Sequence, residues 1–253
     1  MKTKHLDFLR LFNLIKIEII TNYRTLLLGA GAITGVLLFL SLATVRSSFS
    51  WNFHDTFYPF VLFFVGYIFT STAFKELHQY PRNYSYLTLP ASILEKFLTK
   101  FLLTSAGFII ITLIGYFVFS ILAAVLTNLV FGRSFPLFDP FNSDVWTVIK
   151  VYFITQSIFL FGSVYFKSHS LLKVLLSSFL FSLFISLLFL LTFKIVFHSY
   201  SMYELNFSVD RYEFYQMESL GRAIATVSKA IFHYMLAPYF WVLTFLRLKE
   251  TEV

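Results

Sequence analysis

The sequence predicts an all-α integral membrane protein with six transmembrane helices, an interfacial amphipathic helix near the N-terminus and both termini in the cytoplasm. Three observations predict this fold class. Apolar runs close to 20 residues recur along the 253-residue chain, and a helix needs about 20 such residues to cross a bilayer core. Charged residues make up 13% of the chain, against about 25% in soluble domains. Lysine and arginine are concentrated on alternate loops, as the positive-inside rule describes.

Residues 6–24, LDFLRLFNLIKIEIITNYR, predict an amphipathic helix that lies in the inner membrane interface. Phe8, Leu11, Phe12, Ile15 and Ile19 recur at helical spacing and form one apolar stripe. Polar and charged residues at positions 7, 10, 18 and 22 interrupt the segment too often for it to cross. We expect its lysines and arginines to face the lipid headgroups. Packing of the same stripe on another subunit is the alternative.

The six expected spans are bounded by polar or turn residues and lack the alternation of a strand. Backbone groups in lipid must be hydrogen-bonded within their own segment, so these runs predict helices. We place the spans at about 25–45, 57–74, 101–127, 145–166, 174–197 and 226–246, within a single transmembrane domain, 1–253. The polar segment 198–225 is expected to form a short helix or re-entrant piece over the outer mouth, because a slack loop of that length is uncommon.

The basic residues orient the chain. With the N-terminus inside, four basic residues fall on outer segments (Arg46, Arg133, Arg211, Arg222) and thirteen on inner ones (Lys2, Lys4, Arg10, Lys16, Arg24, Lys75, Arg82, Lys96, Lys100, Lys167, Lys173, Arg247, Lys249). The net charge of +7 therefore reflects membrane orientation, and no nucleic-acid partner is expected. Lys150, Lys194 and Lys229 lie near outer span ends. Either their ammonium groups reach the headgroups, or they form a basic collar for an anionic substrate.

The chain lacks the common patterns of catalytic and nucleotide sites. It contains no GxxxxGK[ST], no HExxH and no GxSxG. It has no cysteine and its six histidines are scattered, so no metal site is expected. All thirteen acidic residues fall outside the expected spans, which disfavours proton- or sodium-coupled transport. We therefore expect no enzymatic activity and no cofactor on this chain, and any energy for transport would enter from elsewhere.

Small residues mark two faces where helices can approach closely. Gly31 and Gly35 form a GxxxG in the first span, and Ser178, Ser182 and Ser186 recur every four residues in the fifth. Both faces suit either a dimer seam or a contact within the chain.

The longest inner loop, about 76–96, joins spans two and three. The segment from Phe74 is expected to continue the second span as a polar helix until Pro81 ends it. Pro90 and the capping box of Ser92 and Glu95 predict the start of the next helix. The intervening RNYSYLTL would hold tyrosines just outside the inner leaflet, where they suit a protein interface. An aromatic belt on lipid headgroups is the alternative.

The stretch FKELHQYPRNYSYLTLPASILEKFL at 74–98 resembles the membrane (permease) subunits of bacterial ABC exporters with the type-2 transmembrane fold. The resemblance lies in a leucine-proline-alanine-serine step followed by a glutamate-lysine entry into span three. The ending YFWVLTFLRLKETEV, 239–253, is similar to the tails of such permeases. Six spans, an interfacial N-terminal helix and a polar last outer loop agree with that family over most of the chain.

The resemblance implies that two such subunits, identical or different, pair in the bacterial plasma (inner) membrane. Each would dock on a separate cytoplasmic ATPase that binds ATP and Mg²⁺. The coupling loop would be 76–96, with docking residues Glu76, Arg82, Tyr84, Tyr86, Leu87 and Glu95. Spans rich in phenylalanine and leucine suit a lipid-like or amphipathic peptide substrate, and the same composition suits surfaces that contact membrane lipid. A non-transporting scaffold or sensor that docks a cytoplasmic partner through this loop is the alternative function.

Overall fold

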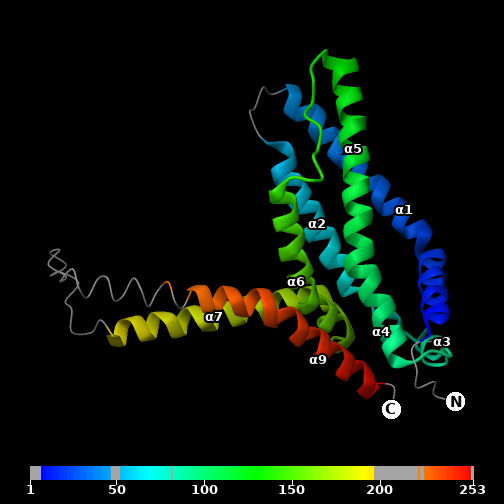
Figure 1. Ribbon diagram of the computed structural model, residues 1–253, viewed down its shortest axis with the longest axis vertical. Helices are drawn as coiled ribbons and strands as arrows, with labels where there is room; N and C mark the ends of the chain where they lie inside the picture. The colour runs from blue at the N-terminus through cyan, green and yellow to red at the C-terminus, as the bar shows by residue number, and fades with distance from the viewer. Residues whose placement is uncertain (1–6, 47–51, 81, 197–221, 223–224, 252–253) are drawn as a thin grey trace.

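The computed structural model describes residues 7–46, 52–80, 82–196, 222 and 225–251 (Figure 1). These residues form helices, turns and an irregular connection at 133–139, with no strand among them. Six helical segments in the described ranges are long and apolar enough to cross a membrane. The prediction of an all-α fold with six helices able to span a membrane is thereby confirmed for the described residues. Nearly all of the expected outer loop 198–225 lies outside the described residues.

The helices follow the expected order along the chain. They are α1 (Phe8–Arg46), α2 (Phe53–Ser71), the 3₁₀ turn η1 (Lys75–His78), α3 (Arg82–Leu87), α4 (Ile93–Leu102), the π-helical turn η2 (Leu103–Gly107), α5 (Phe108–Phe131), α6 (Ser143–Tyr165), α7 (Ser170–Val196), the π-helical turn η3 (Ile231–Met235) and α9 (Leu236–Thr251). The segment from Ile93 to Phe131 is helical throughout and forms one candidate span, as does the segment from Ala225 to Thr251.

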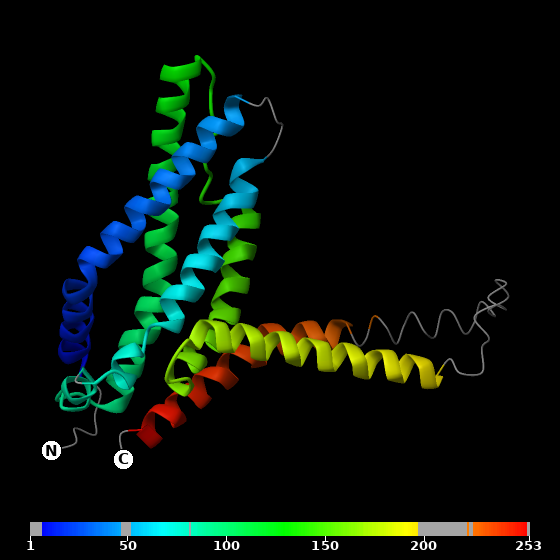
Figure 2. The ribbon, with the colours of Figure 1, turned by 180° about the vertical axis from the view of Figure 1, so that it is seen from behind.

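Helices α1, α2, α5 and α6 form an elongated bundle (Figures 1 and 2). Its core is aromatic and includes Tyr58 and Leu62 of α2, Phe119 of α5 and Tyr152 of α6. Gly66 allows α2 to approach α6, because a β-carbon there would lie 2.6 Å from the hydroxyl oxygen of Tyr152 and against its ring. Helices α2 and α6 are therefore in close contact in the middle of the bundle.

The expected interfacial helix and the expected first span form one continuous helix, α1. Its 39 residues correspond to about 58 Å, well beyond the roughly 30 Å of a bilayer core. Its first turns run in a different direction from the rest (Figures 1 and 2). In this part of α1, Asn22 donates from its side-chain amide to the carbonyl oxygen of Glu18 at 3.0 Å, a local contact of the kind that bends helices. The sequence pattern separated an amphipathic segment ending at residue 24 from the apolar span that follows. It did not indicate that both belong to one continuous helix.

Helix α2 ends earlier than the sequence indicated, at Ser71 instead of Pro81. The Ser71 hydroxyl donates to the carbonyl of Ile68, and the Thr72 hydroxyl donates to the carbonyls of Ile68 and Phe69. Such side-chain bonds compete with the helical ladder. A turn and then η1 follow, and Gln79 is extended. The segment RNYSYLTL, expected as an exposed connection, contains the short helix α3.

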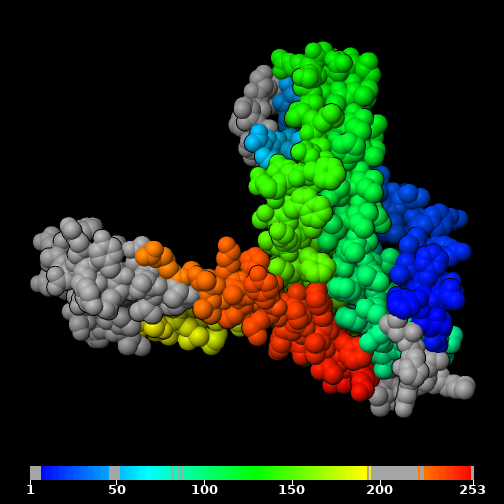
Figure 3. All heavy atoms as spheres, viewed as in Figure 1, coloured from blue at the N-terminus to red at the C-terminus, as the bar shows by residue number. Residues whose placement is uncertain are grey.

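Helix α7 and the segment leading to α9 leave the bundle sideways and form an arm (Figures 1 and 3). Helix α7 crosses α6 at Gly162, where a β-carbon would collide with Val174. His169, immediately before α7, adopts a φ of 51° and sets the new direction of the chain. Helix α9 returns from the arm to pack on α6, where the rings of Trp241 and Phe153 lie 5.4 Å apart. Most of the apolar surface of α7 contacts no described residue of this chain.

Candidate partner-docking site

The loop between α2 and α4 lies at one end of the bundle, beside the first turns of α1 (Figure 1). It consists of η1, α3 and the turn to α4. Two hydrogen bonds organise α3: the Asn83 backbone N–H donates to the carbonyl of Gln79 at 2.8 Å, and the Thr88 hydroxyl donates to the carbonyl of Tyr84 at 2.8 Å. The loop is therefore a folded element and not a slack connection.

The capping box predicted at the start of α4 is confirmed. Ser92 is the N-cap, and its hydroxyl accepts from the backbone N–H of Glu95 at 3.2 Å. In return, the Glu95 carboxylate accepts from the backbone N–H of Ser92 at 2.7 Å. The helix starts at Ile93, three residues after Pro90, because the first turn needs this reciprocal pair to satisfy its free N–H groups.

Glu95 also holds the beginning of α1. Its second carboxylate oxygen accepts from the backbone N–H of Asp7 at 2.8 Å, and the Arg10 guanidinium lies 3.5 Å from that oxygen. The Glu95 residue is 0% exposed. Two backbone donors and one arginine satisfy this buried carboxylate, as a buried charge requires.

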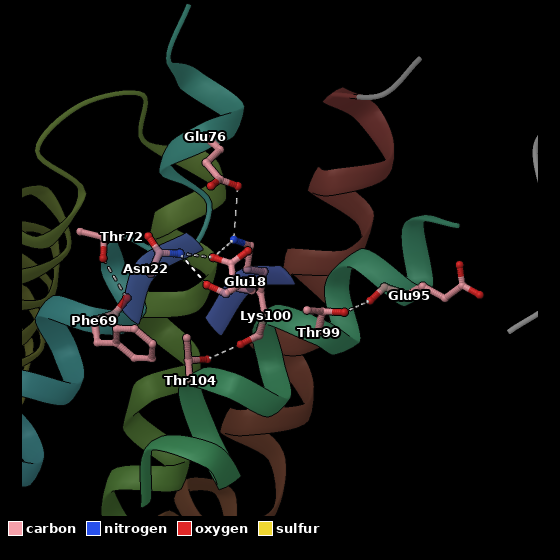
Figure 4. Close-up of polar contacts among 9 residues, drawn as sticks. All are labelled: Glu18, Asn22, Phe69, Thr72, Glu76, Glu95, Thr99, Lys100 and Thr104. Carbon is pink, nitrogen blue, oxygen red and sulfur yellow. Dashed lines mark hydrogen bonds and ion pairs between the residues drawn. The ribbon is translucent and has the colours of Figure 1, made fainter. Parts of the chain in front are cut away.

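Lys100, one and a half turns further along α4, makes a second connection (Figure 4). Its ammonium nitrogen lies 2.7 Å from Glu18 of α1 and 3.5 Å from Glu76 of η1. The Lys100 side chain is 6% exposed. We call Arg10, Glu18, Glu76, Glu95 and Lys100 the charged anchor. The charged anchor joins α1, η1 and α4. Charged residues of α1 that were expected to face lipid headgroups, such as Arg10, therefore contact the loop and α4 instead.

The outward face of the loop is aromatic. Tyr84 is 61% exposed and Tyr80 is 81% exposed, and their rings meet edge to face at 5.8 Å. Tyr86 is buried, with the Lys96 ammonium over its ring at 5.1 Å. The sequence missed Tyr80, although its i, i+4 spacing from Tyr84 was a usable signal.

The predicted docking residues therefore separate into different roles. Tyr84 is on the surface, whereas Tyr86 and Glu95 are buried and position the loop from inside. Glu76 is partly exposed and takes part in the charged anchor. The side chains of Arg82 and Leu87 lie outside the described residues. The tyrosines and glutamates were predicted as docking residues from their residue types. The sequence did not indicate which face of α3 would pack against the rest of the chain.

The three outer lysines are not brought together. Lys150 lies on α6 in the bundle, whereas Lys194 and Lys229 lie on the arm (Figure 1), and all three are exposed. The small residues Gly31, Gly35, Ser178, Ser182 and Ser186 are also exposed. A β-carbon at either glycine would meet nothing within 4 Å, so neither packs closely on another described part of the chain.

One buried polar residue was not singled out from the sequence. Gln156, in α6, is 0% exposed, and neither its amide nitrogen nor its amide oxygen has a hydrogen-bond partner among the described residues. A glutamine near the middle of a candidate span was the available signal, since polar groups inside a membrane are costly.

Comparison of the chain with protein-family models, with curated proteins and with solved structures finds no match.

Proposed function

We propose that this chain is the permease subunit of an ATP-driven ABC exporter in a bacterial plasma membrane, coupled to a separate cytoplasmic ATPase. Its docking element is the loop 76–96. The observation that carries the proposal is that an exposed tyrosine pair, Tyr80 and Tyr84, stands on a loop whose base is tied by the charged anchor. Tyrosine supplies large contact area at low entropic cost, as a protein interface requires.

The connections of the loop suit the transmission of a displacement. Helices α4 and α5 are joined by η2 without a break in the helix, so movement of the loop passes directly into a candidate span. Glu95 and Lys100 pass the same movement to α1 through buried or nearly buried contacts. ATP-driven closure of the partner would then move these helices together as rigid bodies.

Pairing with a second permease subunit is part of the same proposal. The face of α1 that carries Gly31 and Gly35 is open, and small residues permit close approach of a helix from another chain. The distribution of lysine and arginine favours a cytoplasmic position for both termini. The apolar character of the spans favours a lipid-like or amphipathic peptide substrate.

The test is co-purification of the tagged chain from its native membrane, followed by identification of the bound proteins. We expect a protein containing GxxxxGK[ST] to be bound by the wild-type chain and lost from the double variant Tyr80→Ala, Tyr84→Ala. Tyr239→Ala is the matched control, because Tyr239 is exposed on α9, away from the loop. Equal recovery of the ATPase with the double variant would exclude the tyrosine pair as its docking surface.

The assay also separates the alternative function. Recovery through the same tyrosines of a cytoplasmic protein that lacks a phosphate-binding loop would favour a scaffold or sensor. Tyr86 is deliberately left unchanged in these variants, because its burial means that truncation would disturb the loop itself.

A further inference from the structure

Lys100 is a nearly buried cation that two acidic residues share. Its side chain is 6% exposed, whereas the side chains of Glu18 and Glu76 are 26% and 31% exposed. Figure 4 shows the ammonium group of Lys100 between the two carboxylates, of which Glu18 comes from α1 and Glu76 from η1. One lysine of α4 therefore contacts two parts of the chain that are far apart in the sequence.

The two contacts differ in strength. The ammonium nitrogen of Lys100 lies 2.7 Å from Oε1 of Glu18, the distance of a full charge-assisted hydrogen bond, and 3.5 Å from Oε2 of Glu76, which is at the outer limit of one. The same oxygen of Glu18 accepts from the side-chain amide of Asn22 at 3.1 Å, which holds the carboxylate in place on α1. Lys100 is thus bonded to α1 in this structure, and a shift of less than about 1 Å would bring Glu76 to full hydrogen-bond distance.

A buried ammonium group needs at least one carboxylate partner. Leaving it unpaired is strongly destabilising, because water cannot reach it to replace the lost contact. Within the described ranges, no acidic side chain other than Glu18 and Glu76 lies at ion-pair distance from Lys100. Either carboxylate satisfies the charge, so the docking loop can shift relative to α1 without leaving Lys100 unpaired.

We propose that Lys100 is a two-position tie, whose ammonium group passes from Glu18 of α1 to Glu76 of η1 when the docking loop moves away from α1. In the position seen here, Lys100 ties α4 to α1. In the other position it ties α4 to η1 and releases α1. An element with two discrete arrangements is what a switching transition requires. The tie itself does not depend on an ATPase, whereas its use in coupling rests on the proposed function.

The first test uses the purified full chain in nanodiscs, without an ATPase, and hydrogen exchange followed by mass spectrometry. In Glu18→Gln we expect the ammonium group to move to Glu76, because an ionised carboxylate attracts it more strongly than a carboxamide does. Exchange should become about threefold faster in a peptide covering 12–22 of α1 and about threefold slower in one covering 74–80 of η1, as suits partly exposed pairs. Unchanged exchange of the η1 peptide would indicate a fixed contact and overturn the proposal.

A double-mutant cycle measures whether the two carboxylates replace each other. Glu18→Gln and Glu76→Gln should each speed exchange at 94–102 of α4 only about threefold, since the remaining carboxylate keeps Lys100 paired. The double variant leaves the ammonium group without a carboxylate and should speed exchange about 100-fold, well beyond the roughly ninefold that independent losses would give. A double variant that shows only the product of the single effects would also overturn the proposal.

Two controls separate the shared ammonium group from a general loss of structure. In a Lys100→Met background the excess of the double variant should disappear, because no ammonium group remains to be shared, and methionine keeps the apolar stem of the lysine. An excess that persists there would assign the coupling to the two glutamates alone and contradict the proposal. Glu250→Gln, whose pair with Arg247 is exposed, should leave all three peptides unchanged. If the double variant does not fold, the η1 peptide of Glu18→Gln still decides.

Discussion

Replacing Glu95 by glutamine should loosen the connection between α1 and α4 without unfolding the bundle. The two carboxylate oxygens of Glu95 accept from two different backbone donors, Asp7 at 2.8 Å and Ser92 at 2.7 Å. A carboxamide has a single acceptor oxygen, so one of these N–H groups would face another donor. A hydrogen bond to a charged group contributes about 1.5–3 kcal/mol, and the site is fully buried, so solvent does not weaken it. We expect a local loss of about 2–3 kcal/mol.

Hydrogen exchange followed by mass spectrometry measures this loss directly. A destabilisation of about 2–3 kcal/mol corresponds to roughly 30- to 140-fold faster exchange in peptides that cover 7–15 and 88–97, since each 1.4 kcal/mol is tenfold. Peptides from the bundle centre should be unchanged. Glu250→Gln, which removes only an exposed pair with Arg247, is the control. Wild-type exchange of both peptides in Glu95→Gln would refute the role assigned to this carboxylate.

Three further substitutions test the packing, each in purified protein. Ser92→Ala should cost about 1 kcal/mol by removing the N-cap acceptor, seen as faster exchange at the start of α4 and nowhere else. Gly66→Ala should lower the melting temperature, at about 1–3 kcal/mol, because its methyl group meets Tyr152, whereas Gly115→Ala meets open space and should be neutral or stabilising; equal melting of the two would contradict the close helix approach. Gly35→Leu should reduce chemical cross-linking between two chains and leave the monomer's melting temperature unchanged, and undiminished cross-linking would exclude this face from the pair.

Much of the docking loop could be predicted from local sequence, and its burial could not. The capping box follows from residue types at fixed spacing, and it is present as predicted. The exposure of Tyr84 and the burial of Tyr86 depend on which side of α3 meets Lys96, near the start of α4, and the end of α9, which is distant in the sequence. For the same reason Glu95, predicted as a docking residue, is buried: besides its capping contact with Ser92 it contacts Asp7 and Arg10, more than 80 residues away.

The sequence by itself determined that this is a helical membrane protein, because hydrocarbon requires long apolar segments that satisfy their own backbone hydrogen bonds. The length and composition of the apolar runs are enough to identify such segments, so six candidate spans could be predicted without knowledge of tertiary contacts. Only the tertiary structure decided which charges pair, which tyrosines face outward, and which two carboxylates share the ammonium group of Lys100. Those features depend on contacts between helices that are dozens of residues apart in the sequence. A local sequence pattern does not indicate where two such helices cross.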